Sequence, residues 1–294
     1  MNHAYRTDLA MESLEMSRRQ AQNAGALSGV RSREREIEGF SVTSVEILDE
    51  QGAAQIGKPV GIYETFCLDA LMRREEDAFP RACRALADLT RGLLPEHADG
   101  PALVIGLGNR QITPDAVGPR AADYIIATRH LTTQAPEYFA SWRPVSALAP
   151  GVLGQTGVEV GELLAAVAKA VQPSVILAVD ALAAGSLTRL SRTVQLTNAG
   201  IVPGSGVHNA RAALNEQTLG VPVIALGVPT VVDGATLVAE LTGGKAVPPD
   251  AAPLIVTTRD IDREVADVSR LIGYALNLAL QPDLSPKDID LYLS

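Results

Sequence analysis

The chain has 294 residues, 47% of them hydrophobic and 20% charged, a composition typical of a globular protein rather than a disordered one. Its net charge is −9, and no stripe of Lys and Arg interleaved with aromatic residues is present, so we expect no direct binding to nucleic acid. Residues 1–15 lack the apolar core of a secretory signal, and the longest apolar run near the end, residues 271–280, is about half of the roughly 20 residues that a membrane helix needs. We therefore expect a cytoplasmic protein that does not enter the membrane.

The first hundred residues predict an arm, a small β-meander and a helix. Residues 1–38 are polar with charges of mixed sign, which is typical of a surface arm with at most a short helix. Residues 40–48 alternate as a strand does, and we expect them to pair in a hairpin or meander with residues 53–66. Apolar residues at helical spacing over 68–94 predict a helix, whose clearer part begins at Pro80. The two cysteines, Cys67 and Cys83, are expected to be free thiols of a reducing compartment.

From residue 101 onward, buried strands alternate with helices. Several strands are continuous apolar runs rather than alternating ones, which favours a mainly parallel sheet with helices on both faces, a phosphorylase/hydrolase-like α/β fold. The expected strands are 102–108, 143–151 (strand or loop), 173–182, 192–197 and 221–232. The expected helices are 113–130, 157–172, a helical turn at 208–216, 233–241 and 259–280.

Glycines at Gly106 and Gly108 follow the first of these strands, as in a nucleotide-binding loop. The dinucleotide motif requires a third glycine where this chain has Gln111, and no Lys-Ser/Thr pair of a Walker loop follows. We expect the glycines to permit a tight turn. A nucleotide-binding or small-molecule-binding module stays open as an alternative function.

The same turn leads to Asp115. Thr113 is a suitable helix N-cap, which places Pro114 at the first helical position and Asp115 at the second. An aspartate there can be purely structural, because it stabilises the helix dipole by ~0.3–1 kcal/mol. This helix, however, starts at the carboxyl end of a parallel strand, the edge at which α/β sheets bind ligands.

Asp180 ends the apolar run of residues 175–179, at the end of a strand that should be central and buried. A buried aspartate needs a partner or a function. If strands 101–107 and 174–180 are neighbours, Asp115 and Asp180 converge at one edge of the sheet. Two close carboxylates then share a proton or bind a metal, and either arrangement activates water for hydrolysis.

The other candidate residues lie in a glycine-rich loop. His208 is a possible metal ligand or base, although a loop histidine is more often plain surface. The turn at residues 203–206 offers backbone N–H groups to a developing oxyanion, or is only a turn.

Six segments together carry a family resemblance: "GLGNRQITPDAVGP", "TRHL", "RPVSALAPGVLGQTG", "AVDALAAGSLTRL", "GIVPGSGVHNAR" and "LGVPVIALGVPTVVD". From Tyr5 to about Asp233 the chain resembles the germination proteases of spore-forming bacteria, whose core is similar to that of the hydrogenase-maturation endopeptidases. The resemblance implies a cytoplasmic endopeptidase of the forespore and spore core that degrades small acid-soluble spore proteins during germination and forms a homotetramer. The essential aspartates of the family map onto Asp115 and Asp180, which implies an aspartic-type mechanism without a cofactor.

A metallopeptidase that holds a divalent ion on Asp115, Asp180 and His208 stays open, because the equivalent carboxylates of the hydrogenase-maturation relatives help to hold a metal. In the aspartic-type mechanism we expect Asp115 to stay ionised near its helix N-terminus and Asp180 to carry the shared proton.

The resemblance also gives the N-terminal arm a function. Residues 8–12 place an acid, an apolar residue, alanine, any residue and an acid in order, a frame similar to that cut in the spore-protein substrates. We therefore predict a zymogen that cuts itself between Asp8 and Leu9, so that residues 1–8 are a short propeptide. Residues 9–294 are then one peptidase domain, with the arm, meander and helix at 9–100 and the catalytic core at 101–294.

Overall fold

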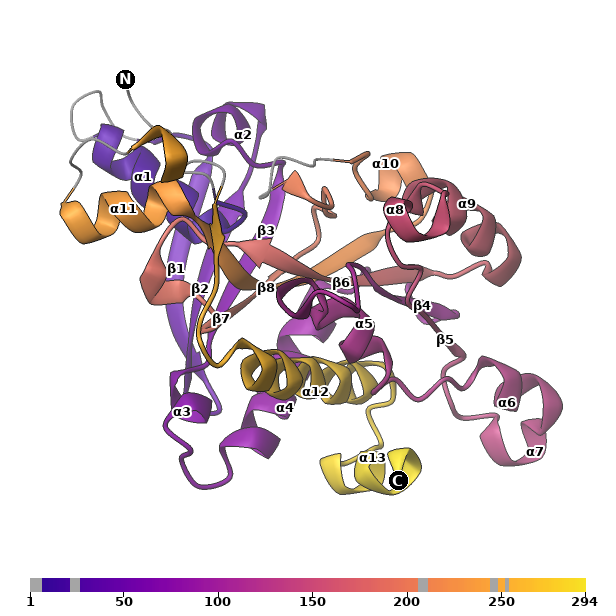
Figure 1. The fold of residues 1–294 in the computed structure, drawn as a ribbon. Coiled ribbons are helices and arrows are strands. Elements are labelled where there is room, and N and C mark those ends of the chain that lie inside the picture. Colours follow the sequence, from indigo (N-terminus) through magenta and orange to yellow (C-terminus); the bar gives the residue numbers. More distant parts are fainter. Residues whose placement is uncertain (1–6, 22–26, 206–210, 244–247, 252–253) are drawn as a thin grey trace.

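The computed structural model is built around a twisted mixed sheet with helices on both faces (Figure 1). It describes residues 7–21, 27–205, 211–243, 248–251 and 254–294.

The sheet has a parallel half and an antiparallel half. Its strands follow the order β1-β2-β3-β7-β8-β6-β4-β5, and β9 pairs with the end of β8. The strands β8, β6, β4 and β5 run parallel, whereas β1, β2, β3 and β7 are joined to one another and to β8 by antiparallel pairs. The prediction of a mainly parallel sheet from residue 101 onward is therefore correct only for β8, β6, β4 and β5, because β7, which also follows residue 101, runs antiparallel beside β8. The strands are β1 Val30–Ile37, β2 Phe40–Ile47, β3 Gly61–Cys67, β4 Ala102–Gly106, β5 Val145–Leu148, β6 Val175–Ala183, β7 Thr193–Thr197, β8 Val223–Asp233 and β9 Ile255–Val256.

One face of the sheet is covered by a continuous layer of helices. α12 packs against α4 and α5, and these three helices bury the larger apolar core with alternate residues of the central strands. Among the described helices, none is both long and apolar enough to cross a bilayer. The helices are α1 Ala10–Ala21, α2 Glu50–Ile56, α3 Asp69–Met72, α4 Ala78–Leu93, α5 Val117–Ala122, α6 Arg129–Gln134, α7 Pro136–Phe139, α8 Leu153–Thr156, α9 Val160–Val171, α10 Glu216–Leu219, α11 Gly234–Thr242, α12 Ile261–Leu280 and α13 Pro286–Leu293.

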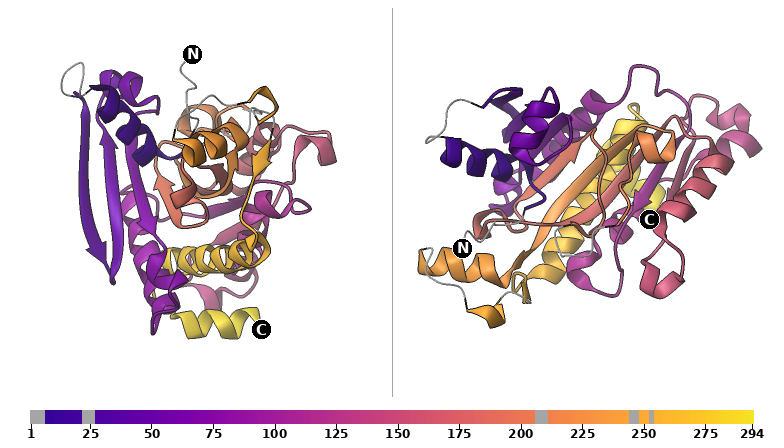
Figure 2. Two further views of the ribbon diagram at one scale, coloured as in Figure 1. Left: turned by 60° about the vertical axis from the view of Figure 1, so that its left-hand side comes forward. Right: turned by 90° about the horizontal axis from the view of Figure 1, so that it is seen from above.

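On the opposite face, the described helices pack on the sheet near its two ends. α1 and α2 pack on β2 and β3 through a small apolar cluster, and α9 packs on β4 and β6 through another. Seen from above, the central strands stay visible between these two groups of helices (Figure 2). Asp8 and Ala10, at the entry to α1, are hydrogen-bonded to Ala183 of β6 and Gln195 of β7.

Several expected elements differ from the structure. Residues 30–37, assigned to the arm, form β1, and α2 interrupts the expected hairpin between β2 and β3. The helix expected over 113–130 is divided into a short 3-10 turn, α5 and α6. The helical turn expected at 208–216 falls partly outside the described residues; of its described part, residues 211–215 are not helical and Glu216 begins α10.

Candidate active site

The glycine turn after β4 brings the chain back against its own next segment. A Cβ atom at Gly106 would lie 2.1 Å from the carbonyl oxygen of Gly118, so only glycine fits there. Gly108 has a φ of 108°, and its backbone approaches the carbonyl of Asp115 in the same way. The glycines of the turn are therefore needed because two backbone segments lie in close contact there. At the end of the turn, the N–H of Asn109 donates to Oδ2 of Asp115 at 2.8 Å.

Asp115 is held differently from the way the sequence suggested. Thr113 is not an N-cap: its hydroxyl donates to Asp262, and residues Thr113–Asp115 form a 3-10 turn. α5 begins only at Val117, so the carboxylate of Asp115 is fixed by the Asn109 N–H rather than by the first amides of an α-helix.

Asp180 lies on β6, the strand next to β4, with Gly106 paired to the preceding Val179. The predicted adjacency of the two strands is therefore confirmed. Asp180 is 5% exposed, and its Oδ1 accepts the N–H of Ala181 at 2.9 Å. Burial raises the pKa of Asp180 well above its usual value, and the nearby charges of Asp115 and Asp8 act in the same direction. Burial also raises the pKa of Asp115, against the effect of its hydrogen bond from Asn109.

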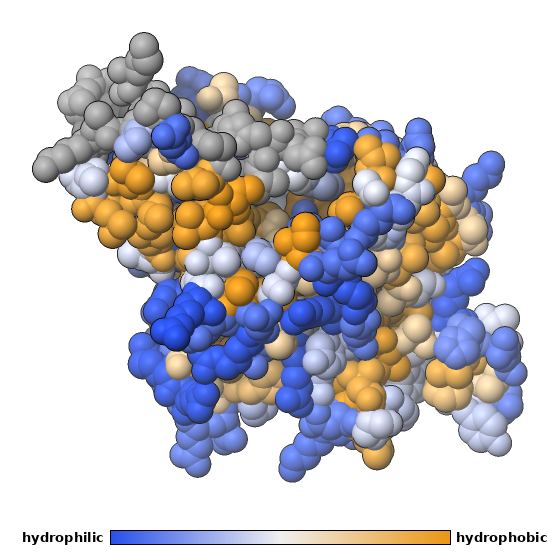
Figure 3. Space-filling model, viewed as in Figure 1, coloured by the Kyte–Doolittle hydropathy of each residue, from blue (hydrophilic) through white to orange (hydrophobic). Residues whose placement is uncertain are grey.

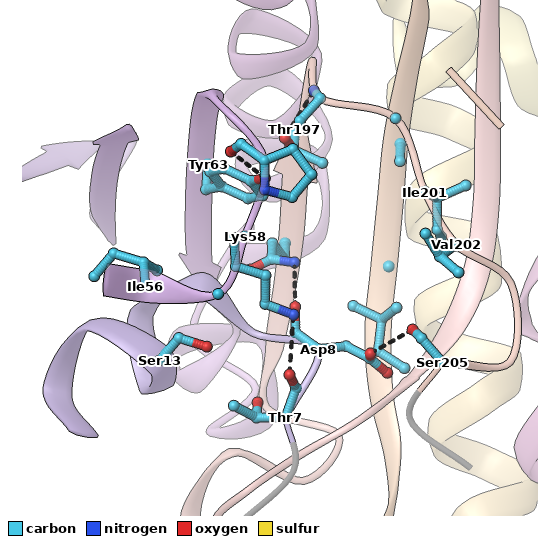
Figure 4. A pocket seen from close by; sticks show the side chains of 18 of the residues that line it. Thr7, Asp8, Ser13, Ile56, Lys58, Tyr63, Thr197, Ile201, Val202 and Ser205 are labelled. Atoms are coloured by element: carbon cyan, nitrogen blue, oxygen red, sulfur yellow. Dashed lines mark hydrogen bonds between the residues drawn. The ribbon is translucent and has the colours of Figure 1, made fainter. Parts of the chain in front are cut away.

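Asp8 reaches the end of the same strand. Its N–H donates to the carbonyl of Ala183 at 3.0 Å, and its Oδ2 accepts the Ala183 N–H at 2.9 Å. Its Oδ1 accepts the hydroxyl of Ser205 at 2.7 Å, and Figure 4 shows this carboxylate turned toward Ser205. Lys58 approaches from the other side and donates to the carbonyl of Thr7 at 3.0 Å.

A cavity of about 1350 Å³ opens over this part of the sheet. Asp8, Asp115 and Asp180 all line it, together with Gly108 and Ser205. Residues 203–205 of the predicted oxyanion turn line it as well, whereas Gly206 and His208 lie outside the described residues.

The described residues do not complete a metal site. Within the ranges that the structure describes, no group of three or more His, Cys, Asp or Glu side chains is close enough to hold an ion. Asp115 and Asp180 would supply two carboxylate ligands, whereas protein metal sites commonly use three or more protein ligands.

Three side chains of this region were not anticipated from the sequence. Gln195 on β7 bonds the backbone of residues 8 and 10, and Arg189 pairs with the acids of α1. Lys58, the third, precedes β3. Gln195 and Lys58 do not follow a buried parallel strand, which was the signal that located the two aspartates. Arg189 does follow β6, but all three meet residues 7–15 only through tertiary structure.

The chain is similar in sequence to known proteins of one family. A family model described as germination protease matches residues 7–242. The germination protease of Caldanaerobacter subterraneus subsp. tengcongensis is 40% identical over 97% of each chain, and that of Clostridium tetani is 38% identical over 98% of this chain and 99% of the relative. The germination protease of Priestia megaterium is 41% identical over 81% of this chain and 66% of the relative. The chain therefore belongs to the germination protease family, and it is a hydrolase that acts on protein.

Proposed function

We propose that this protein is an aspartic-type endopeptidase that is made as a zymogen, cuts itself between Asp8 and Leu9, and then degrades small acid-soluble spore proteins during germination. Asp115 and Asp180 are the proposed catalytic pair. The observation that carries the proposal is the position of Asp8, the residue before the predicted cut, which lines one cavity with both aspartates.

The pKa shifts support different roles for Asp115 and Asp180. Asp180 is the more deeply buried carboxyl and faces the charge of Asp115, so it is the group that holds a proton. Asp115 keeps a charge-stabilising hydrogen bond from Asn109 and is the base that takes a proton from water. The proton on Asp180 then passes to the nitrogen of the departing peptide, so that the pair ends in the opposite protonation state.

The second acid of the predicted frame is also bound. Glu12 is 4% exposed, its Oε2 accepts the Gly185 N–H at 2.6 Å, and the hydroxyl of Thr7 donates to the same oxygen. Arg189 lies 3.5 Å from its other oxygen and also pairs with Glu15. Asp8 and Glu12, the first and fifth residues of the predicted cleavage sequence, therefore each have hydrogen-bonding partners in the fold. This supports the predicted cut after Asp8.

Intact-mass measurement during incubation at mildly acidic pH tests the proposal. We expect loss of residues 1–8 from the wild-type chain and no loss from Asp115→Asn or Asp180→Asn, which should also fail to cut a purified small acid-soluble spore protein. Asp123→Asn is a matched control, because Asp123 pairs with Arg110 on the surface. Processing by Asp180→Asn at the wild-type rate would end the dyad model.

The metal-dependent alternative needs a separate experiment. Prolonged treatment of the processed protein with a chelator should leave an aspartic-type enzyme fully active. Loss of activity that is restored by a divalent metal would assign the same carboxylates to a metallopeptidase. A catalytically silent nucleotide-binding or small-molecule-binding module predicts no mass change under any condition.

We also propose that the chain forms a homotetramer. Apolar side chains gather over the α11 corner of the molecule (Figure 3), where Leu241, Leu254 and Ile255 are 73%, 55% and 58% exposed. Light scattering should show a tetramer that Leu241→Ser weakens. Leu291→Ser should have no effect, because Leu291 is equally exposed but lies on α13. A monomeric wild type would refute this assembly.

A further inference from the structure

The side-chain amide of Gln195 spans the bond that we propose is cut. Its Nε2 donates to the carbonyl oxygen of Asp8 at 3.0 Å, and its Oε1 accepts the N–H of Ala10 at 2.6 Å. The Asp8 carbonyl belongs to the Asp8–Leu9 peptide bond itself. Gln195 is 6% exposed, so both hydrogen bonds lie in a largely desolvated place.

The sheet register aligns Gln195 with the catalytic pair. Gly227 of β8 is the register partner of Asp180 on one side and of Gln195 on the other. Residues directly opposite one another project from the same face of a sheet, so Asp180 and Gln195 face the same side. The intervening Gly227 has no side chain of its own and lies under the side chain of Leu182 from β6. Adjacent strands are about 4.8 Å apart, which puts the two backbones roughly 10 Å apart. The Asp8 carbonyl is bonded to Gln195 on one side of this interval, and Asp8 lines the same cavity as Asp115 and Asp180 on the other.

We propose that Gln195 is a further catalytic residue, one that stabilises the oxyanion formed on the carbonyl oxygen of the bond being cut. This inference rests on the proposed function. Water adds to the carbonyl carbon of Asp8, its proton goes to Asp115, and the carbonyl π electrons move onto the oxygen that faces Gln195 Nε2. The electrons then return, the C–N bond breaks, and the Leu9 nitrogen takes the proton held by Asp180.

Two properties suit Gln195 to this role. An amide donor is uncharged and does not titrate, so its hydrogen bond strengthens as negative charge develops without a change in its own protonation. It also stands on a strand in the middle of the sheet, which fixes a donor more accurately than a loop does.

The state after cutting supports the same role. Once residues 1–8 leave, the buried Nε2 loses its partner on Asp8, and an unsatisfied buried donor is costly. The carbonyl of a substrate that enters the same place restores this hydrogen bond. Gln195 is therefore expected to act on protein substrates as it does on its own chain.

The first-order rate of self-processing in two full-length variants tests the inference. Gln195→Glu keeps an acceptor for the Ala10 N–H but loses the donor to the Asp8 carbonyl, and Gln195→Met loses both. We expect each to slow processing by about 10²–10³-fold, the usual effect of removing one oxyanion donor. Thr193→Val is the matched control, because Thr193 lies two residues away on the same face of β7 and its buried hydroxyl has no partner among the described residues.

Hydrogen exchange separates catalysis from docking. In the uncut Asp180→Asn background, we expect Gln195→Glu to keep the protection of the amides of residues 9–14. A rate within threefold of wild type would overturn the inference, and so would a slow rate accompanied by lost protection, since docking alone would then explain it. If Asp115→Asn and Asp180→Asn stop processing while Gln195→Glu does not, only the role of Gln195 fails. A wild-type chain that never loses residues 1–8 instead refutes the proposed function.

Discussion

Replacing Asp180 with Asn is expected to stabilise the fold at neutral pH while it removes activity. The carboxyl is 5% exposed at the end of β6, and its hydrogen bond within the described residues comes from the adjacent Ala181 N–H. Burial, together with the charges of Asp115 and Asp8, raises its pKa well above the usual value. An amide of the same shape is neutral without taking up a proton on folding. Since an inadequately compensated buried polar group costs about 1–3 kcal/mol, we expect a gain of that size in the free energy of unfolding at pH 7.

The gain in stability of Asp180→Asn over the wild type should increase with pH. Because the folded-state pKa of Asp180 is raised, folding takes up a proton, and wild-type stability is lost as the pH rises from the unfolded-state pKa through the folded-state pKa. Below the ordinary aspartate pKa of about 3.9, the carboxyl is protonated in both states. The advantage of Asp180→Asn should therefore vanish in acid and grow toward neutral pH.

Urea unfolding followed by circular dichroism between pH 3.5 and 8 measures this dependence. Asp115→Asn is the suitable comparison, because it should also stay uncut, while Asp115 is less buried and accepts the Asn109 N–H. The reasoning is refuted if Asp180→Asn is no more stable than Asp115→Asn at pH 7, or if the difference between them is the same at every pH.

Three further predictions concern backbone packing, the burial of a thiol and a buried ion pair. Gly106→Ala should lower the free energy of unfolding by about 1–3 kcal/mol in chemical denaturation, because its Cβ would meet the Gly118 carbonyl, whereas Gly92→Ala on α4 has open space and should not destabilise. Burial raises the pKa of Cys83 to about 12, so this thiol should react with an aromatic disulfide reagent only after denaturation, and fast native labelling would contradict its burial. Arg189→Met should slow self-processing at least tenfold by leaving buried Glu12 without its cation, a loss that typically costs about 3–5 kcal/mol. Arg84→Met, which breaks an exposed pair, should process like wild type.

The parts of the fold that the sequence predicted are those with long apolar patterns. β4, β6 and β8 are continuous apolar runs, and their parallel pairing brings Asp115 and Asp180 to one cavity. β1 was missed because Val30–Ile37 is an edge strand with mostly charged, exposed residues, so it carries no apolar alternation. α2 did leave a signal, since Asp49 caps its first turn and Gly57 ends it in the left-handed region.

The break in the helix expected over 113–130 could not be predicted from local pattern. The chain leaves α5 near residue 123, and Asn277 of α12 then binds the freed backbone, accepting from Ile126 N–H at 2.9 Å and donating to Tyr124 O at 2.6 Å. A partner 151 and 153 residues away in the sequence replaces the helical hydrogen bonds. Gly118 contributes as well, because its close approach to the backbone of Leu107 ties the start of α5 to the glycine turn.

The two halves of the sheet supply different groups to the proposed site. The parallel half places the proposed catalytic carboxylates, on β6 and after β4, while Gln195 on β7 belongs to the antiparallel half, and Arg189 and Lys58 lie just before β7 and β3. A continuous apolar run marks where a parallel strand ends, so the two aspartates could be predicted from the sequence. The groups that bind residues 8–12 meet them only in the folded sheet and could not. The same division means that substitutions in the antiparallel half should change how residues 8–12 are held and polarised without altering the protonation of the aspartate pair. Substitutions at Asp115 or Asp180 should do the reverse, so the two sets of variants separate recognition from water activation within one site.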